Sequence, residues 1–119
     1  ALSFASYYDE VEVVELLLKY GADVNATNNA GNTALMEAAK QGNVDVGRML
    51  LQYGASCNQL NQIGSTALIL ASSANHYEFM QLLIVAGADT EILNNEGWTA
   101  FMLATRRGHI EAMPVLVRA

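Results

Sequence analysis

The sequence contains few of the residues that cross-link chains, break helices or fill large cores. Its 119 residues include one cysteine, one proline and one tryptophan, and aromatic residues make up 8%. A single cysteine, Cys57, excludes a disulfide within the chain and fits a reducing compartment. We therefore expect a cytoplasmic or nuclear location. The scarcity of aromatic residues suits many small helix contacts better than one deep aromatic core.

Basic residues and long apolar runs are also scarce. Six Lys and Arg residues stand against twelve Asp and Glu, which gives a formal net charge of −6. A nucleic-acid partner requires a basic field, so we expect none. No apolar run approaches the ~18 to 20 residues that a membrane-spanning helix needs, so we expect no membrane partner either.

The motifs that carry catalysis or bind cofactors are missing. The sequence has no Gly-rich phosphate loop, no His-x-x-x-His pair and no Cys-x-x-Cys. Its carboxylates follow the outer faces of the expected helices, which is the pattern of a solvated surface. We therefore predict that the chain is not an enzyme and holds no catalytic residue, cofactor or metal site.

What the chain does contain is an internal repeat. The segment Gly31-Asn32-Thr33-Ala34-Leu35 returns as Gly64-Ser65-Thr66-Ala67-Leu68 and as Gly97-Trp98-Thr99-Ala100-Phe101, in two steps of 33 residues. Three other markers keep the same register: a Gly-Ala pair at 21, 54 and 87, a turn position at 42, 75 and 108, and an aliphatic pair at 17, 50 and 83. Four markers in one register establish the repeat.

The first half of each repeat predicts a short helix. Thr33 and its equivalents can cap the helix start by accepting a bond from a backbone N–H. Leu35, Ala38 and Ala39 then fall on one face, where small residues allow close packing. Gly42 is expected to end the helix in a left-handed conformation, with Asn75 as the next most tolerant residue.

The second half of each repeat predicts another helix and a loop. Asn43, His76 and His109 can cap this helix, which is expected to run from Val44 to Tyr53 and to stop at Gly54. The polar run 58–64 then crosses to the next repeat as an extended, hairpin-like turn.

The chain repeats a helix, a turn, a helix and an extended loop in a 33-residue period, and it carries Thr-x-Leu motifs and Gly-Ala-Asp-Val-Asn at 21–25. In these features it resembles the ankyrin repeat family over essentially the whole chain. The resemblance implies an all-α, ankyrin-repeat solenoid of stacked helix-turn-helix units joined by hairpin-like loops. The family's Thr-Pro-Leu-His motif has Ala in place of Pro here, and Met36, Ile69 or Met102 in place of His. We expect apolar packing to replace the hydrogen bonds that this His makes between repeats.

The repeat register divides the chain into one domain, 1–119, with a partial repeat at 1–30, repeats at 31–63 and 64–96, and a partial repeat at 97–119. Ala1 aligns with Ala34, inside a helix, and Ala119 stops just before an expected Gly. We therefore expect a fragment of a longer array, with more repeats or other domains in the parent chain.

The resemblance also implies a function. In the family, loop tips and first-helix ends form a concave face that binds a protein or peptide. Carried onto this sequence, the partner-binding positions are Tyr7, Tyr8, Asn29, Asn32, Lys40, Gln41, Gln62, Ile63, Ser65, Ser73, Asn95, Glu96, Trp98, Arg106 and Arg107. Aromatic residues and Arg are common at binding hot spots. We expect a ligand with an apolar centre and a carboxylate near the last repeat.

Other interpretations of these residues stay open. Trp98 can simply cover its own loop, and Tyr7 and Tyr8 can pack against another repeat. Arg106 and Arg107 can complement a helix dipole. The chain can also be a regulatory or substrate-docking segment of a larger enzyme, or an architectural spacer.

One modification site follows from the resemblance alone. Val24-Asn25, with Leu17 eight residues before the Asn, matches the pattern of ankyrin-type segments that undergo asparaginyl hydroxylation. The alternative is that Asn25 makes loop hydrogen bonds.

Overall fold

The computed structural model describes residues 2–95, 97, 99, 100 and 102. Glu96, Trp98, Arg106 and Arg107 lie outside the described residues, so the statements made about them above remain predictions. The described part contains six helices, which are α1 (Leu2–Tyr7), α2 (Val11–Lys19), α3 (Ala34–Gln41), α4 (Val44–Gln52), α5 (Ala67–Ser73) and α6 (Tyr77–Val85).

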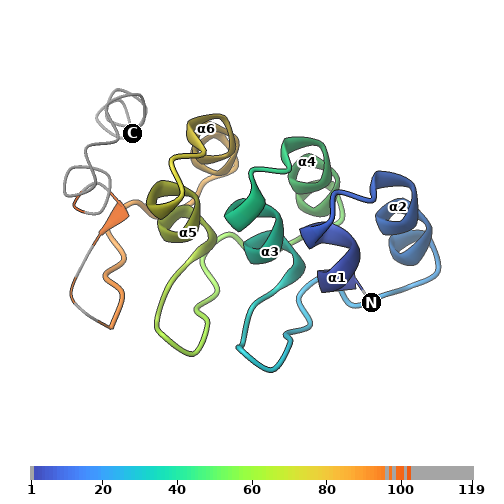
Figure 1. The fold of residues 1–119 in the computed structure, drawn as a ribbon, viewed down its shortest axis with the longest axis horizontal. Helices are drawn as coiled ribbons and strands as arrows, with labels where there is room; N and C mark the ends of the chain where they lie inside the picture. Colours follow the sequence, from blue (N-terminus) through green and yellow to red (C-terminus); the bar gives the residue numbers. More distant parts are fainter. Residues whose placement is uncertain (1, 96, 98, 101, 103–119) are drawn as a thin grey trace.

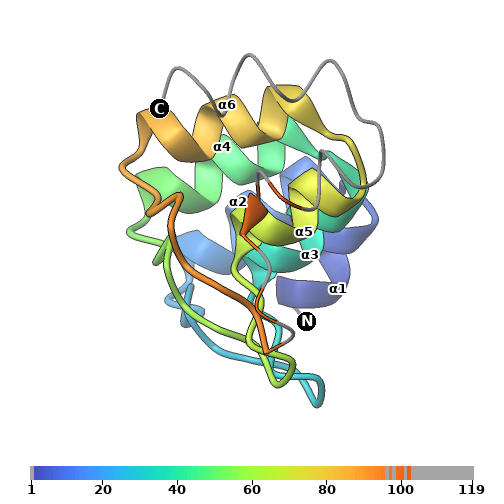
Figure 2. The ribbon, with the colours of Figure 1, turned by 90° about the vertical axis from the view of Figure 1, so that its left-hand side faces the viewer.

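The helices stack as pairs in two parallel rows (Figure 1). The inner helices α1, α3 and α5 contact one another in sequence, as do the outer helices α2, α4 and α6, and each inner helix also packs on the outer helix that follows it. The connecting loops gather on one side of the helices, next to the inner row (Figure 2). No strand occurs in the described residues. The predicted all-α stack of helix-turn-helix units is confirmed.

The inner helices begin and end as the sequence predicts. Thr33 and Thr66 adopt extended backbones at the N-cap, and their Oγ1 atoms accept from Met36 N at 3.3 Å and Ile69 N at 3.2 Å. Gly42 closes α3 with φ of 73°, and Asn75 follows α5 with φ of 61°. Both φ values lie in the left-handed region, which Gly and Asn tolerate best.

The interface between inner helices is apolar and closely packed. Leu35, Ala38 and Ala39 are completely buried, as the predicted face requires. Met36 and Ile69 stand where the resembled family has His, and both are buried in the core. Apolar packing therefore does replace a polar contact at this position.

The prediction that the side chains of Asn43 and His76 cap the outer helices is wrong. Both residues occupy the N-cap position, but neither makes a side-chain cap hydrogen bond. Their backbone ψ values of 80° and 74° differ from the 169° of Thr33, which is the extended conformation that aims a cap at its own helix.

These two side chains instead contact the preceding repeat. Asn43 Nδ2 donates to Ser6 O at 2.8 Å and to Tyr7 O at 3.1 Å, and His76 Nε2 lies 3.1 Å from Lys40 O. The last carbonyls of a helix lack partners within the helix, which makes them available acceptors. Each contact thus joins the end of one inner helix to the start of the next outer helix.

Replacement of Asn43 tests this contact between repeats. We expect Asn43→Ala to lower the free energy of unfolding by about 1–3 kcal/mol, because Tyr7 O and Ser6 O both lose the Asn43 amide and Ser6 O keeps only Asp9 N at 3.4 Å. Asn43→Asp should be destabilised to a similar extent, since a carboxylate cannot donate, although it suits a helix N-terminus. Urea unfolding followed by circular dichroism measures both. An Asp variant as stable as the wild type would show that capping dominates instead.

Outer helices fit together through matched side-chain sizes. Gly47 in α4 lies against Phe79 in α6, and both are buried. A Cβ atom at Gly47 would lie 2.5 Å from Phe79 Cε2, closer than atoms can pack. One repeat earlier, Val14 is in register with Gly47, and Val46, which is smaller than Phe, is in register with Phe79. Gly47 therefore makes room for the phenyl ring.

The contact between Gly47 and Phe79 predicts that Gly47→Ala changes the free energy of unfolding in opposite directions with and without the phenyl ring. Gly47→Ala should destabilise the wild type, because overpacking costs about 1–3 kcal/mol and exceeds the gain in helix propensity of about 1 kcal/mol. In a Phe79→Leu background the same substitution should stabilise, because the ring is gone and only the propensity gain remains. Urea unfolding of the four proteins measures the cycle. Equal effects in both backgrounds would contradict the contact.

Candidate functional site

Each loop tip is organised by one asparagine. Asn28 Oδ1 accepts from Ala30 N and Asn32 N, both at 3.0 Å. Asn61 Oδ1 repeats the arrangement with Ile63 N at 3.1 Å and Ser65 N at 2.9 Å. We call residues 28–32 and 61–65 the finger loops. Their internal hydrogen bonds hold the exposed backbone of each tip in one turn conformation.

Successive tips are also bonded to one another. Gln62 donates through its backbone N to Ala30 O at 3.2 Å and through Nε2 to Asn29 O at 2.8 Å. Asn95 does the same one repeat later, through its N to Ile63 O at 3.2 Å and through Nδ2 to Gln62 O at 3.3 Å. The tips therefore form a continuous edge.

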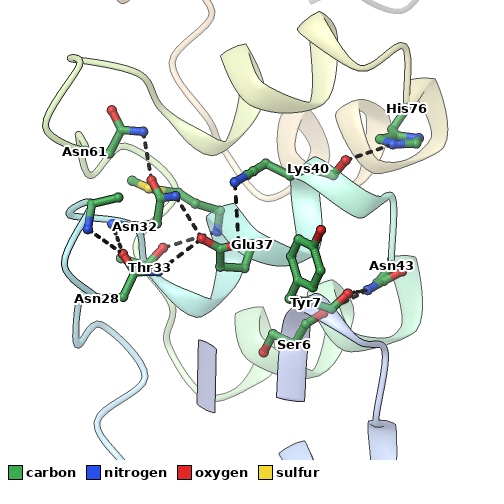
Figure 3. A network of polar contacts seen from close by, with 12 residues as sticks. Ser6, Tyr7, Asn28, Asn32, Thr33, Glu37, Lys40, Asn43, Asn61 and His76 are labelled. Carbon is green, nitrogen blue, oxygen red and sulfur yellow. Dashed lines mark hydrogen bonds and ion pairs between the residues drawn. The ribbon is translucent and has the colours of Figure 1, made fainter. Parts of the chain in front are cut away.

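A buried carboxylate ties the first finger loop to α3 (Figure 3). Glu37 Oε1 accepts from Asn28 Nδ2 at 3.1 Å and from Asn32 Nδ2 at 2.8 Å, and its Oε2 lies 3.7 Å from Lys40 Nζ. Asn32 Oδ1 accepts in turn from Asn61 Nδ2 at 2.8 Å. One network thus fixes a helix and two finger loops. Charge-assisted bonds of this kind are stronger than bonds between neutral groups.

The structure separates the partner-binding positions into three groups. Asn32 and Ser65 are only 5% and 2% exposed, so their side chains offer little surface to a partner. Tyr7 and Ser73 are half-buried. The exposed positions are Tyr8, Asn29, Lys40, Gln41, Gln62, Ile63 and Asn95. These exposed side chains come from the finger loops, the third tip and the ends of the inner helices.

Phe4 forms an aromatic cluster with Tyr7 and Tyr8 at the end of α1. The repeat pattern did not single out Phe4 as a candidate for the site. The ring centroids of Phe4 and Tyr8 lie 4.7 Å apart, and those of Tyr7 and Tyr8 lie 4.9 Å apart. With Ser3, Asn28 and Glu37 these rings line a hollow of about 420 Å³. The spacing of four residues between Phe4 and Tyr8 on a helix is the signal that could have found the pair.

Two further exposed apolar residues, Leu60 and Leu93, lie just before the second and third tips. Together with Ile63 they place aliphatic side chains on adjacent loops.

The loops, the ends of the inner helices and the helix pairs all repeat from one unit to the next. A family model described as ankyrin repeats (3 copies) matches residues 1–61 and 53–119. The chain belongs to the ankyrin repeat family.

Ankyrin repeats are generally protein–protein interaction modules, and they typically lack catalytic activity. In the described part of this ankyrin repeat chain, no three His, Cys, Asp or Glu residues lie close enough together to hold a metal ion. Within those same residues, no helix is both long and apolar enough to cross a membrane.

Asn25 makes the kind of loop hydrogen bond that the sequence analysis kept as an alternative to modification. Its Oδ1 accepts from Ser56 N at 2.8 Å, and the equivalent Asn58 Oδ1 accepts from Asp89 N at 2.8 Å. Both side chains thus join the bases of neighbouring loops in this ankyrin stack. Hydroxylation of Asn25 stays a prediction.

Cys57 has the properties of a packing residue. It is half-buried, and burial raises the pKa of its thiol. The reactive form of cysteine is the thiolate, so a raised pKa makes Cys57 a poor nucleophile at neutral pH.

Labelling of Cys57 with iodoacetamide should therefore be slower in the native ankyrin domain than in the urea-unfolded chain at the same pH. Because the folded state holds the proton more tightly, the contribution of the thiol to stability should be present below the pKa of the unfolded chain. It should be lost as the pH rises above that value. Cys57→Ser supplies the unlabelled control and should lack this alkaline loss. Faster labelling of the native protein would instead indicate an activated thiol.

Proposed function

We propose that this ankyrin repeat domain binds a protein or peptide on a surface that we call the binding face. It consists of the finger loops, the residues just before the tips and the ends of the inner helices. The observation that carries the proposal is a group of exposed aliphatic side chains, Leu60, Ile63 and Leu93, on loops whose backbones are held by hydrogen bonds. Exposed apolar side chains that gather together mark interaction surfaces.

The rigidity of these loops supports binding. Ordering a flexible loop on association costs free energy, and a preorganised loop avoids much of that cost. The bonds from Gln62 and Asn95 to the preceding tips, and the Glu37 network beneath them, hold the aliphatic side chains in place before a partner arrives. Affinity then depends on complementarity rather than on folding of the loops.

The charges on the described part favour an apolar ligand centre. Glu37, which lies beneath the binding face, is paired with Lys40. Unpaired acidic side chains such as Glu12 and Glu78 are exposed on outer helices instead. The proposed ligand therefore has an apolar centre over the second finger loop and the loop that carries Leu93. Arg106 and Arg107, at the sequence positions that follow the inner-helix register, suit a ligand carboxylate near the last repeat.

Two matched aspartate substitutions test the binding face. Ile63 on a finger loop is 61% exposed, and Val85 at the end of the outer helix α6 is 81% exposed, so Asp at either position should leave the fold intact. In quantitative affinity capture, we expect Ile63→Asp to reduce recovery of specific partners by about tenfold or more, because losses above 1.4 kcal/mol are typical of a central contact. Val85→Asp should retain those partners.

Circular dichroism and thermal unfolding first establish that both variants fold like the wild type. Equal capture by all three proteins, or equal loss in both variants, would place the binding surface elsewhere. Trp98→Ala extends the comparison to a position outside the described residues and tests whether the ligand also contacts the last repeat.

A further inference from the structure

A groove lies between the outer helices α4 and α6, away from the finger loops (Figure 2). Two hollows of about 200 Å³ and about 610 Å³ follow one another along it, and Val44, Tyr77 and Glu78 line both. We call the space between Val44 and Arg48 of α4 and residues 77–85 of α6 the outer groove. Both of its walls are described helices that contact each other, so it lies within the stack and not at an end of it.

The α6 wall of the outer groove carries an uncharged ridge. Tyr77, Gln81 and Val85 are spaced by four residues, so they lie on one face of the helix. On α4 the last two of these register positions carry Arg48 and Gln52. Tyr77 is 42% exposed and Val85 is 81% exposed, so packing within the stack leaves much of both side chains in contact with solvent. Exposed apolar side chains beside a hollow indicate a site for a partner.

The shape of the outer groove fits a helix. From Tyr77 to Val85 the ridge covers about two helical turns, or about 12 Å. Two common ways to bind a peptide are to add it as a strand to a sheet edge and to lay it as a helix into an apolar groove. The described residues contain no strand, so that part of the chain offers no sheet edge. A helical ligand remains, with apolar side chains at every third or fourth residue.

Carboxylates stand at one end of the outer groove. Glu78 and Asp45 are the second residues of α6 and α4, and Glu12 takes the same place on α2. All three side chains are exposed. Asp45 Oδ1 lies 3.3 Å from Arg48 Nη1, whereas Glu78 makes no ion pair within the described residues. The end of the groove at the start of α6 therefore carries an uncompensated negative charge.

We propose that the outer groove docks an amphipathic helix of a protein partner, with Lys or Arg in the last turn of that helix. The apolar face of the ligand covers the ridge from Tyr77 to Val85, and its basic side chains lie beside Glu78. Basic side chains in the last turn also complement the dipole of the ligand helix. The ligand helix therefore runs antiparallel to α6, with its C-terminus beside the N-terminus of α6.

The charge of the whole chain supports a basic occupant. The formal net charge of −6 attracts a basic ligand before contact is made. The same charge disfavours a second copy of this chain in the groove, because two copies repel each other. Arg48 lies on the α4 wall, and its pairing with Asp45 reduces its repulsion of the ligand.

Two synthetic peptides of the same composition test the orientation. Each forms an amphipathic helix of about four turns with Leu on one face, and the Lys residues lie in the last turn of the first peptide and in the first turn of the second. Fluorescence anisotropy of the labelled peptides measures binding to the full chain. We expect the first peptide to bind more tightly, and Glu78→Gln should reduce this preference by about threefold. A preference that is unchanged in Glu78→Gln would come from the peptides alone and would contradict the orientation.

A double substitution tests the ridge. Tyr77→Val with Val85→Gln gives α6 the residues that α4 carries at the same register positions, so the variant should keep the fold, which circular dichroism establishes first. We expect it to bind the first peptide at least about tenfold more weakly, because the exposed apolar contact is lost. Ile63→Asp on a finger loop is the control, and it should bind this peptide as the wild type does.

Failure of the wild type to bind the first peptide at about millimolar concentration would overturn the proposal, as would equal binding by the wild type and the double variant. Loss of binding in Ile63→Asp would overturn it too, because the peptide would then lie on the binding face. Sedimentation of the free chain as a dimer that the double variant disrupts would show that a second copy is the occupant. Because the ridge and the finger loops are substituted separately, this proposal and the proposed function can each fail without the other.

Discussion

A pair of short helices in this ankyrin repeat domain cannot bury its apolar face by itself. The inner helix α3 lies between α1 and α5, and its Leu35, Ala38 and Ala39 are buried because both neighbours pack against it. In such arrays the free energy of folding comes from the sum of the units and the interfaces between them. Small residues on the inner helices allow close packing, and the polar contacts described above then fix the register of each unit on the next.

The same contacts that stabilise the stack also organise the binding face. Glu37 is on an inner helix, but its carboxylate holds the first finger loop, and through Asn32 it also reaches the second. The proposed binding positions and the stacking positions therefore share hydrogen bonds. The side chains of Leu60, Ile63 and Leu93 are largely exposed on these loops, so a substitution there removes little buried apolar surface. A repeat protein can thus change its ligand at these positions without loss of its fold.

Features that depend on local backbone chemistry could be predicted from the sequence. Thr33, Gly42 and Asn75 act within one turn of their own helix, and the structure shows the expected caps and left-handed residues. The contacts of Asn43 could not be predicted in this way, because its acceptors lie 36 and 37 residues earlier in the chain. Glu37 was missed for the same reason, since on its helix alone it resembles a solvated carboxylate. The burial of Asn32 follows from its bonds to Glu37 and Asn61, which periodicity does not reveal.

One position in the repeat register shows how two different side chains make the same contact. Asn43 and His76 share this position, and each meets carbonyls at the end of the preceding inner helix. An amide or an imidazole N–H donates to those carbonyls, and each does so in this chain. Asn43 and His76 therefore join successive units through donors of different chemistry at one register position.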